Sequence, residues 1–254
     1  TKAFWCWDLP KPFALRMLAL TLSHICRVAD QPAMTSQQQI YPVLWSFRRC
    51  PYAMRARLAI AAGRSRVWLR EILLRDKPDA FIAASPKATV PVLVLPDGAV
   101  IEESRDIMIW ALQNSDPQGW LSVWQNDQPF CTRFLDHLDG PFKQHLDHYK
   151  YASRFAAEVG EESRRMGAEF LAEIDQKLAA GSGFLSGAGF GLLDAATLPF
   201  VRQFRGVDAN WFDRRDWPAL HHWLGMFLAS EHFAAVMHKY PPWHVGDSAL
   251  LFPA

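Results

Sequence analysis

The chain has 254 residues, half of them hydrophobic, and its 27 lysines and arginines almost balance its 26 acidic residues. This length can hold one large or two modest domains with a proper core, and a net charge of +1 lacks the basic excess typical of nucleic-acid binding. No uncharged apolar run reaches the roughly 18 residues that suggest a membrane span, so we expect neither a nucleic acid nor a membrane as partner.

Residues 1–40 differ in composition from the rest of the chain. An apolar stretch over 13–29 is broken by Arg16 and Arg27, and a polar run over 35–39 follows it. The stretch is weakly basic and poor in acids, which is compatible with a targeting presequence. We favour a non-native extension with the natural start at Met34, and we read no function from this segment.

Strand and helix patterns alternate from residue 40 onward. The expected elements are a strand over 43–47, a helix over 51–62, a strand over 67–74, a short helix over 78–84, strands over 90–95 and 99–102, and a helix over 104–113. The first crossover implies a parallel strand pair, whereas Pro96-Asp97-Gly98 predicts a hairpin and therefore an antiparallel pair. These patterns predict an α/β domain with a mixed four-stranded sheet and helices on both faces.

Strand signals stop after residue 119, and helical periodicity continues to the C-terminal region. Helices are expected over 128–150, 162–180, 192–204, 217–229 and 231–238, separated by joints that contain glycine or proline. The second half is therefore predicted to be all-α. We place the domain boundaries at 41–117 for the first domain and 127–245 for the second.

Cys50 is the residue with the clearest chemical potential. Pro51 suits the first position of a helix, which places Cys50 at the N-cap, beside free amide groups and the positive end of the helix dipole. Four nearby arginines add positive potential: Arg48, Arg49, Arg55 and Arg57. Both effects should lower the pKa of the thiol. A lone cysteine beside a helix is usually inert, so the assignment depends on the rest of the domain.

Two further features accompany Cys50. Pro91 opens a strand, and a cis Val90–Pro91 bond would turn the Val90 backbone outward, where an extended peptide can pair with it. Ser104 is expected to cap the last helix of the domain, so its hydroxyl and the free amides would bind a carboxylate while Glu103 accepts an ammonium. Taken singly, each feature has an ordinary structural explanation. Together they predict a thiolate, a peptide edge and an amino-acid site.

The set Cys50-Pro51-Tyr52-Ala53, Val90-Pro91 and Glu103-Ser104 resembles the glutathione transferase superfamily in order and spacing. The resemblance covers residues 41–245 and is greatest to the cysteine-type classes, which are omega-, lambda- and dehydroascorbate-reductase-like. It implies a thioredoxin-like domain followed by a helical domain. It also implies that glutathione is the co-substrate and that the protein is a cytoplasmic homodimer, and we predict no metal site. The implied glutathione-binding residues are Tyr52, Val90, Pro91, Glu103 and Ser104.

The implied activity is thiol-disulfide exchange by a monothiol. A dithiol glutaredoxin would carry its resolving cysteine at the position of Ala53, so external glutathione would complete the cycle on a disulfide or small-molecule substrate. Two alternatives stay open at this point. One is conjugation of glutathione to small aromatics or its reductive removal from them, and the other is a catalytically silent binding module. For the first alternative, the residues expected to supply aromatic walls for a second substrate are Tyr52, Trp124, Phe130, Tyr149 and Trp211.

Two positions depart from the family pattern or leave a role open. Asp194 resembles the family's buried capping aspartate, but glycine stands at the cap position, Gly191, so the reciprocal side-chain bond should be lost. Lys87 is the basic residue nearest before Pro91, and its role is left open.

Overall fold

The computed structural model describes residues 40–154 and 157–253. Residues 1–39 of the predicted extension, with Cys6 and Cys26, lie outside the described residues. None of the helices in the described ranges is long and apolar enough to cross a membrane.

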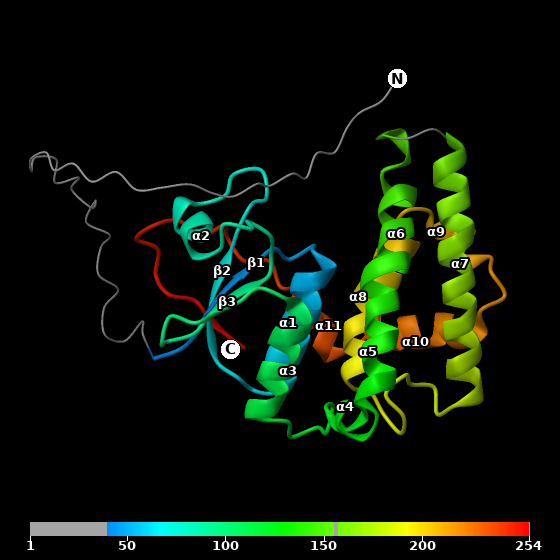
Figure 1. Cartoon of the computed structure of the whole chain (residues 1–254), viewed down its shortest axis with the longest axis horizontal. Coiled ribbons are helices and arrows are strands. Elements are labelled where there is room, and N and C mark those ends of the chain that lie inside the picture. The colour runs from blue at the N-terminus through cyan, green and yellow to red at the C-terminus, as the bar shows by residue number, and fades with distance from the viewer. Residues whose placement is uncertain (1–39, 155–156, 254) are drawn as a thin grey trace, which may run out of the picture. The chain divides into compact units, whose positions relative to one another are not determined.

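A mixed sheet forms the first half of the fold (Figure 1). In the part of the chain that the structure describes, five strands are joined in the order β4-β3-β1-β2-β5. Their bounds are β1 Val43–Ser46, β2 Val67–Glu71, β3 Val92–Val94, β4 Val100–Ile101 and β5 Leu251–Phe252. β1 and β2 are parallel, and the other neighbours are antiparallel. The mixed sheet with its four strands in the first domain is thus confirmed, and a fifth, unpredicted strand of two residues near the C-terminus joins its edge.

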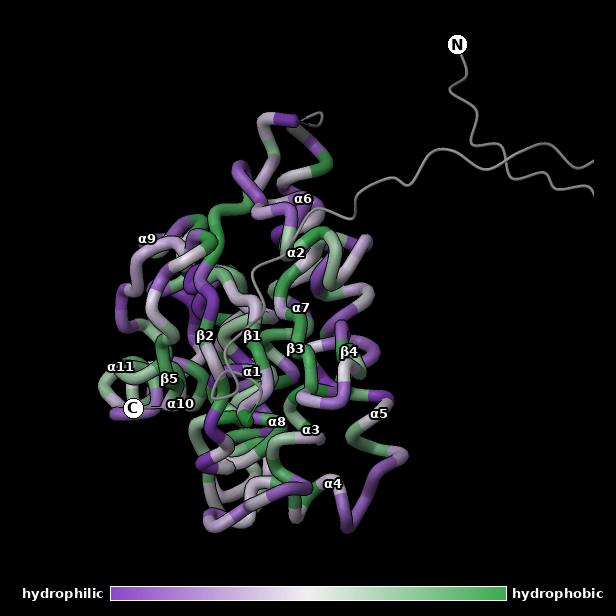
Figure 2. The backbone as a smooth tube through the Cα atoms, turned by 90° about the vertical axis from the view of Figure 1, so that its left-hand side faces the viewer, coloured by the Kyte–Doolittle hydropathy of each residue, from purple (hydrophilic) through white to green (hydrophobic). Residues whose placement is uncertain are grey.

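The two faces of the sheet are covered by different helices, as the alternation of side chains along β1 requires. Val43 and Trp45 pack with Phe81 of α2 (Asp79–Ala84) on one face. Leu44 lies on the opposite face, in the core shared with α1 (Pro51–Ala62) and α3 (Ser104–Asn114). β1 and β3 therefore carry hydrophobic residues on both sides. Figure 2 shows the hydrophobic character of β3 in green.

Helices make up the second half, as predicted. Their bounds are α4 Ser122–Asn126, α5 Gln128–His137, α6 Lys143–Lys150, α7 Ala157–Ala180, α8 Leu192–Arg205, α9 Ala209–Asp213, α10 Pro218–Leu228 and α11 Glu231–Met237. The expected single helix over 128–150 is interrupted by a π-helical turn over Leu138–Phe142. Pro141 lies in this turn and cannot donate a backbone hydrogen bond, which accounts for the widened turn. α4 and α9 were not predicted, since each is only five residues long.

The start of α8 shows how the chain compensates for glycine at the cap. Asp194 accepts hydrogen bonds from the backbone amide of Gly191 at 3.1 Å and from the indole of Trp223 at 2.8 Å. The hydroxyl of Ser186 accepts the backbone amide of Leu193 at 3.0 Å, as a serine at the cap position would. Asp194 therefore keeps its half of the capping box, and Ser186 supplies the missing acceptor from the preceding loop.

Candidate active site

A cavity of about 540 Å³ brings together the residues predicted to bind glutathione. Its lining comprises Cys50, Tyr52, Leu74, Lys77, Lys87, Ala88, Thr89, Val90, Pro91, Glu102, Glu103, Ser104 and Asp139. The first turn of α1, the segment before β3 and the start of α3 supply most of these residues, although they are separated by up to 54 positions in the sequence. The three features singled out in the sequence thus share one site.

Cys50 is the N-cap residue of α1, with Pro51 at the first helical position, as expected. Its thiol lies 3.7 Å from the carbonyl oxygen of Val90, to which it can donate. Burial raises the pKa of the Cys50 thiol above its ordinary value, and this is the largest effect. The amides of Ala53 and Tyr52, followed by the charges of Lys143 and Arg57, act in the opposite direction. The expected lowering of the Cys50 pKa is therefore wrong, because burial of the thiol raises the pKa more than the amides at the start of α1 lower it.

The Val90–Pro91 peptide bond is cis, as the sequence indicated. Val90 is buried and its carbonyl faces the Cys50 thiol, so the backbone before β3 and the sulfur border the same space. An extended peptide in the cavity would therefore meet both polar backbone and thiol.

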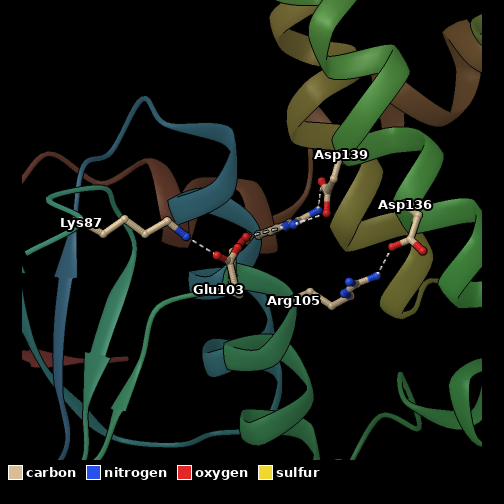
Figure 3. Close-up of polar contacts among 7 residues, drawn as sticks. Lys87, Glu103, Arg105, Asp136 and Asp139 are labelled. Carbon is tan, nitrogen blue, oxygen red and sulfur yellow. Dashed lines mark hydrogen bonds and ion pairs between the residues drawn. The ribbon is translucent and has the colours of Figure 1, made fainter. Parts of the chain in front are cut away.

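The start of α3 differs in detail from the prediction. Glu103 is the N-cap residue and Ser104 is the first helical residue, so Ser104 does not cap the helix. Its hydroxyl instead accepts a hydrogen bond of 3.0 Å from Nε of Arg55. Glu103 is exposed and forms an ion pair with Lys87, the basic residue whose role the sequence leaves open (Figure 3). Carboxylate, ammonium and hydroxyl groups therefore stand side by side at the cavity rim.

Arg55 and Asp139 are site residues whose partnership the sequence analysis missed. Arg55 is 2% exposed and donates two hydrogen bonds of 2.8 Å to the carboxylate of Asp139, which Figure 3 labels. Its guanidinium also lies over the rings of Tyr52 and Phe200, 5.0 and 5.3 Å from their centroids. The sequence indicates Arg55 only as a source of positive potential. The one signal for its partner was Asp139-Gly140-Pro141 within a helical run, which marks the π-helical turn.

Tyr52 lies between these charged groups and the helical half. Its ring makes an edge contact with Phe200 of α8 at 4.9 Å between centroids. Burial, then the negative charge of Asp139, raises the pKa of Tyr52, so its hydroxyl stays protonated and can act as a donor. The residue that lines the cavity next to Cys50 is therefore a neutral hydrogen-bonding group.

The other aromatic residues considered for a second substrate are not brought together. Tyr149 lines a cavity of about 580 Å³ beside α7 and α9, and Trp211 lines another of about 900 Å³. Trp124 and Phe130 pack against the helical core. None of these four residues lines the Cys50 cavity. The structure thus offers no shared wall made of this set.

A thioredoxin-like mixed sheet followed by an all-helical half, with a cysteine at the start of the first helix, defines the class of protein. Two family models match: "Glutathione S-transferase, N-terminal domain" over residues 44–119 and "Glutathione S-transferase, C-terminal domain" over residues 157–225. Together they cover more than half of the chain, in the order that the family requires. The chain belongs to the glutathione transferase superfamily.

Solved structures share the fold. A tau-class glutathione S-transferase from mango, Mangifera indica, is 25% identical, with a TM-score of 0.64 over 78% of this chain and 93% of that chain. A glutathione transferase family member from Pseudomonas fluorescens, solved with two glutathione bound, is 16% identical, with a TM-score of 0.66 over 80% of this chain and 95% of that chain. The fold is therefore that of the superfamily.

The match to a curated relative covers a shorter part of this chain. A protein of Aplysia californica described as "Probable glutathione transferase" is 46% identical over 55 residues, which are 22% of this chain. The chain thus spans 60% of the length of that relative.

Proposed function

We propose that this chain is a glutathione-dependent thiol transferase of the cysteine type, with Cys50 as nucleophile and glutathione as co-substrate. The observation that carries the proposal is the shared cavity: Cys50, the cis Val90–Pro91 segment and the Glu103-Ser104 start of α3 all line it. Glutathione offers a thiol, peptide groups and an α-amino acid end, and the three features match these parts in kind. Lys87 and Glu103 together provide charges of both signs for the amino acid end.

The arrangement of thiols favours a monothiol cycle. Ala53 stands where a second thiol of the same helix turn would lie. Cys131, the other cysteine among the described residues, is buried, and its sulfur donates to the carbonyl of Val123 at 3.5 Å. Cys131 is not among the residues that line the Cys50 cavity. Among the described residues, no second thiol lines the Cys50 cavity, so external glutathione completes the proposed cycle.

The proposed cycle has two exchange steps. The Cys50 thiolate attacks the glutathionyl sulfur of a mixed disulfide, forms a Cys50–glutathione disulfide and releases the substrate as a thiolate that takes up a proton. The thiolate of a second glutathione then attacks the glutathione sulfur bound to Cys50. Oxidised glutathione leaves and the Cys50 thiolate is regenerated. The free glutathione thus supplies the electrons that reduce the substrate sulfur, and the glutathione first bound to the substrate leaves as the other half of oxidised glutathione.

Intact-protein mass spectrometry tests this proposal. After exposure to a glutathione mixed disulfide, wild type should carry one glutathione on Cys50, since no other cysteine of the described ranges lines its cavity. Cys50→Ala should lose the adduct and the turnover, whereas Cys50→Ser should lose the adduct and is the matched variant in size. An adduct on another cysteine, or wild-type disulfide reduction by Cys50→Ala, would contradict the proposal. Aryl conjugation by wild type in place of disulfide reduction would favour the conjugating alternative.

Assembly, location and the glutathione contacts of single residues stay predictions. We propose a homodimer, which light scattering on the purified chain can test, and a cytoplasmic location. We further propose that Tyr52, Val90, Pro91, Glu103 and Ser104 contact glutathione, as their places in the cavity allow.

A further inference from the structure

Arg48 precedes the Cys50 N-cap by two residues and is held at three points. Its backbone amide donates to the Glu71 carboxylate at 2.5 Å, and its carbonyl accepts from Nη2 of Arg57 at 3.0 Å. Its guanidinium donates to the carbonyl of Met237, at the end of α11, at 3.4 Å. Both backbone polar groups of a loop residue are thus satisfied by side chains from α1 and β2, which fixes its orientation more tightly than a solvated turn.

Arg57 and Glu71 form a buried ion pair behind this turn. Their side chains are 0% and 8% exposed, and Nη1 of Arg57 lies 3.6 Å from Oε2 of Glu71. Burial lowers the pKa of Arg57 and raises that of Glu71, and the charge of each residue opposes this effect on the other. A buried ion pair contributes little net stability compared with an apolar pair of the same volume. Its role is therefore better explained by the groups that it contacts.

The far side of the pair is closed by the C-terminal segment. The backbone amide of Trp243 donates to the carbonyl of Glu71 at 2.8 Å. The ring of Trp243 makes an edge contact with Trp45 at 5.1 Å, and the guanidinium of Arg70 lies 4.3 Å from its centroid. Beyond it, β5 pairs with β2. Glu71 is therefore anchored by its backbone on one side and holds Arg48 with its side chain on the other.

The turn leads directly into the reactive position. The amide of Cys50 donates to the carbonyl of Phe47 at 3.0 Å, so the four residues from Phe47 to Cys50 form one closed turn around Arg48. Burial dominates the pKa of the Cys50 thiol, and the amides of Ala53 and Tyr52, then the charges of Lys143 of α6 and Arg57 of α1, oppose it. Arg57 thus acts on Cys50 in two ways. Its hydrogen bond to Arg48 holds the turn before Cys50, and its charge favours the thiolate.

We propose that Arg57 and Glu71 are positioning residues that set the reactivity of Cys50. Both hold Arg48 in the turn before Cys50, and the carboxylate of Glu71 balances part of the positive charge of Arg57. This inference rests on the proposed function only in taking Cys50 as the reacting group. Arg57 favours the thiolate, and Glu71 offsets part of that effect while it keeps Arg57 in place.

Alkylation of Cys50 by iodoacetamide across pH, followed on the Cys50 peptide by mass spectrometry, tests the proposal on the full chain. Arg57→Met/Glu71→Gln keeps an acceptor for the Arg48 amide but removes the cation, so the midpoint should rise. The rate at neutral pH should then fall by about tenfold for each pH unit of the rise. Glu71→Gln alone leaves Arg57 unbalanced and should shift the midpoint downward. Arg57→Lys keeps a cation and should leave the midpoint near that of wild type.

A matched control is Arg205→Met/Asp213→Asn, which removes a partly exposed ion pair of the helical half and should leave alkylation unchanged. Thermal melting of every variant separates stability from reactivity. Opposite shifts in the double and single variants support the proposal, because a merely structural pair would lower the melting temperature without moving the midpoint. Unchanged midpoints, or shifts in the same direction, would overturn it. Alkylation uses no glutathione, so failure of the proposed function would appear separately, as absent disulfide turnover with these shifts intact.

Discussion

Arg55 and Asp139 join the first helix of the sheet half to the π-helical turn of the helical half through two parallel hydrogen bonds of 2.8 Å. The same guanidinium donates its Nε to Ser104 at 3.0 Å, so one buried side chain connects α1, α3 and the turn between α5 and α6. Bidentate arginine–carboxylate pairs are strong and directional. Arg55 therefore contacts three residues that line the Cys50 cavity: Tyr52, Ser104 and Asp139.

Asp139→Asn should lower the free energy of unfolding by about 1.5–3 kcal/mol, because it removes charged hydrogen bonds from an almost fully buried guanidinium. Urea denaturation measures the loss. Asp136→Asn is the matched control on the same helical run, since Asp136 pairs with Arg105 in an exposed position. The control should cost less than about 1 kcal/mol. Equal losses in the two variants would mean that the Arg55 pair has no special weight.

The pH dependence of Cys50 should follow its raised pKa. A thiol whose pKa lies above the free value of about 8.5 is mostly protonated at neutral pH, so alkylation should accelerate through neutral pH and still rise above pH 8.5. Stopped-flow or mass-spectrometric rates from acid to alkaline pH would show this. A plateau reached below that value would restore the original expectation from the helix start and the neighbouring arginines.

Glu103→Gln and Ser104→Ala should separate binding from stability. Glu103 is exposed, so its variant should weaken glutathione binding by about 1.5–3 kcal/mol and leave the melting temperature unchanged. Ser104→Ala should also destabilise the fold, because Nε of Arg55 would lose its acceptor in a buried place. Calorimetry and thermal melting measure the two effects. Full affinity in both variants would place glutathione elsewhere.

Much of the sheet half could be predicted because its signals are local. The helix from Pro51 and the Asp97-Gly98 hairpin each depend on residues that are neighbours in sequence, and the cis Val90–Pro91 bond follows from the place of a proline before a strand. β5 could not be predicted, because a two-residue strand is defined only by its partner, β2, some 180 positions away.

The site was predicted in its residues but not in its energetics. Cys50, Pro91 and Ser104 could be named from spacing, and the cavity brings them together. The pKa of Cys50 was misjudged because desolvation depends on what covers the thiol, which spacing does not reveal. The partners of Arg55 and Arg57 were missed for the same reason, since long-range ion pairs have no signature in a single sequence.

The cap of α8 offers a test in which two substitutions should compensate. Ser186→Gly removes the acceptor for the Leu193 amide and should cost about 0.5–1.5 kcal/mol, the net contribution of one hydrogen bond. Gly191→Ser should cost about 1–3 kcal/mol, because a Cβ at position 191 would lie 2.7 Å from Cβ of Ser186. The double variant frees that space and returns a hydroxyl to the cap position itself, so its cost should be smaller than the sum of the single costs. Gly189→Ser is the control, since a Cβ there meets nothing within 4 Å. Urea denaturation of the four variants completes the double-mutant cycle, and strictly additive costs would show that Ser186 does not act as the cap of α8.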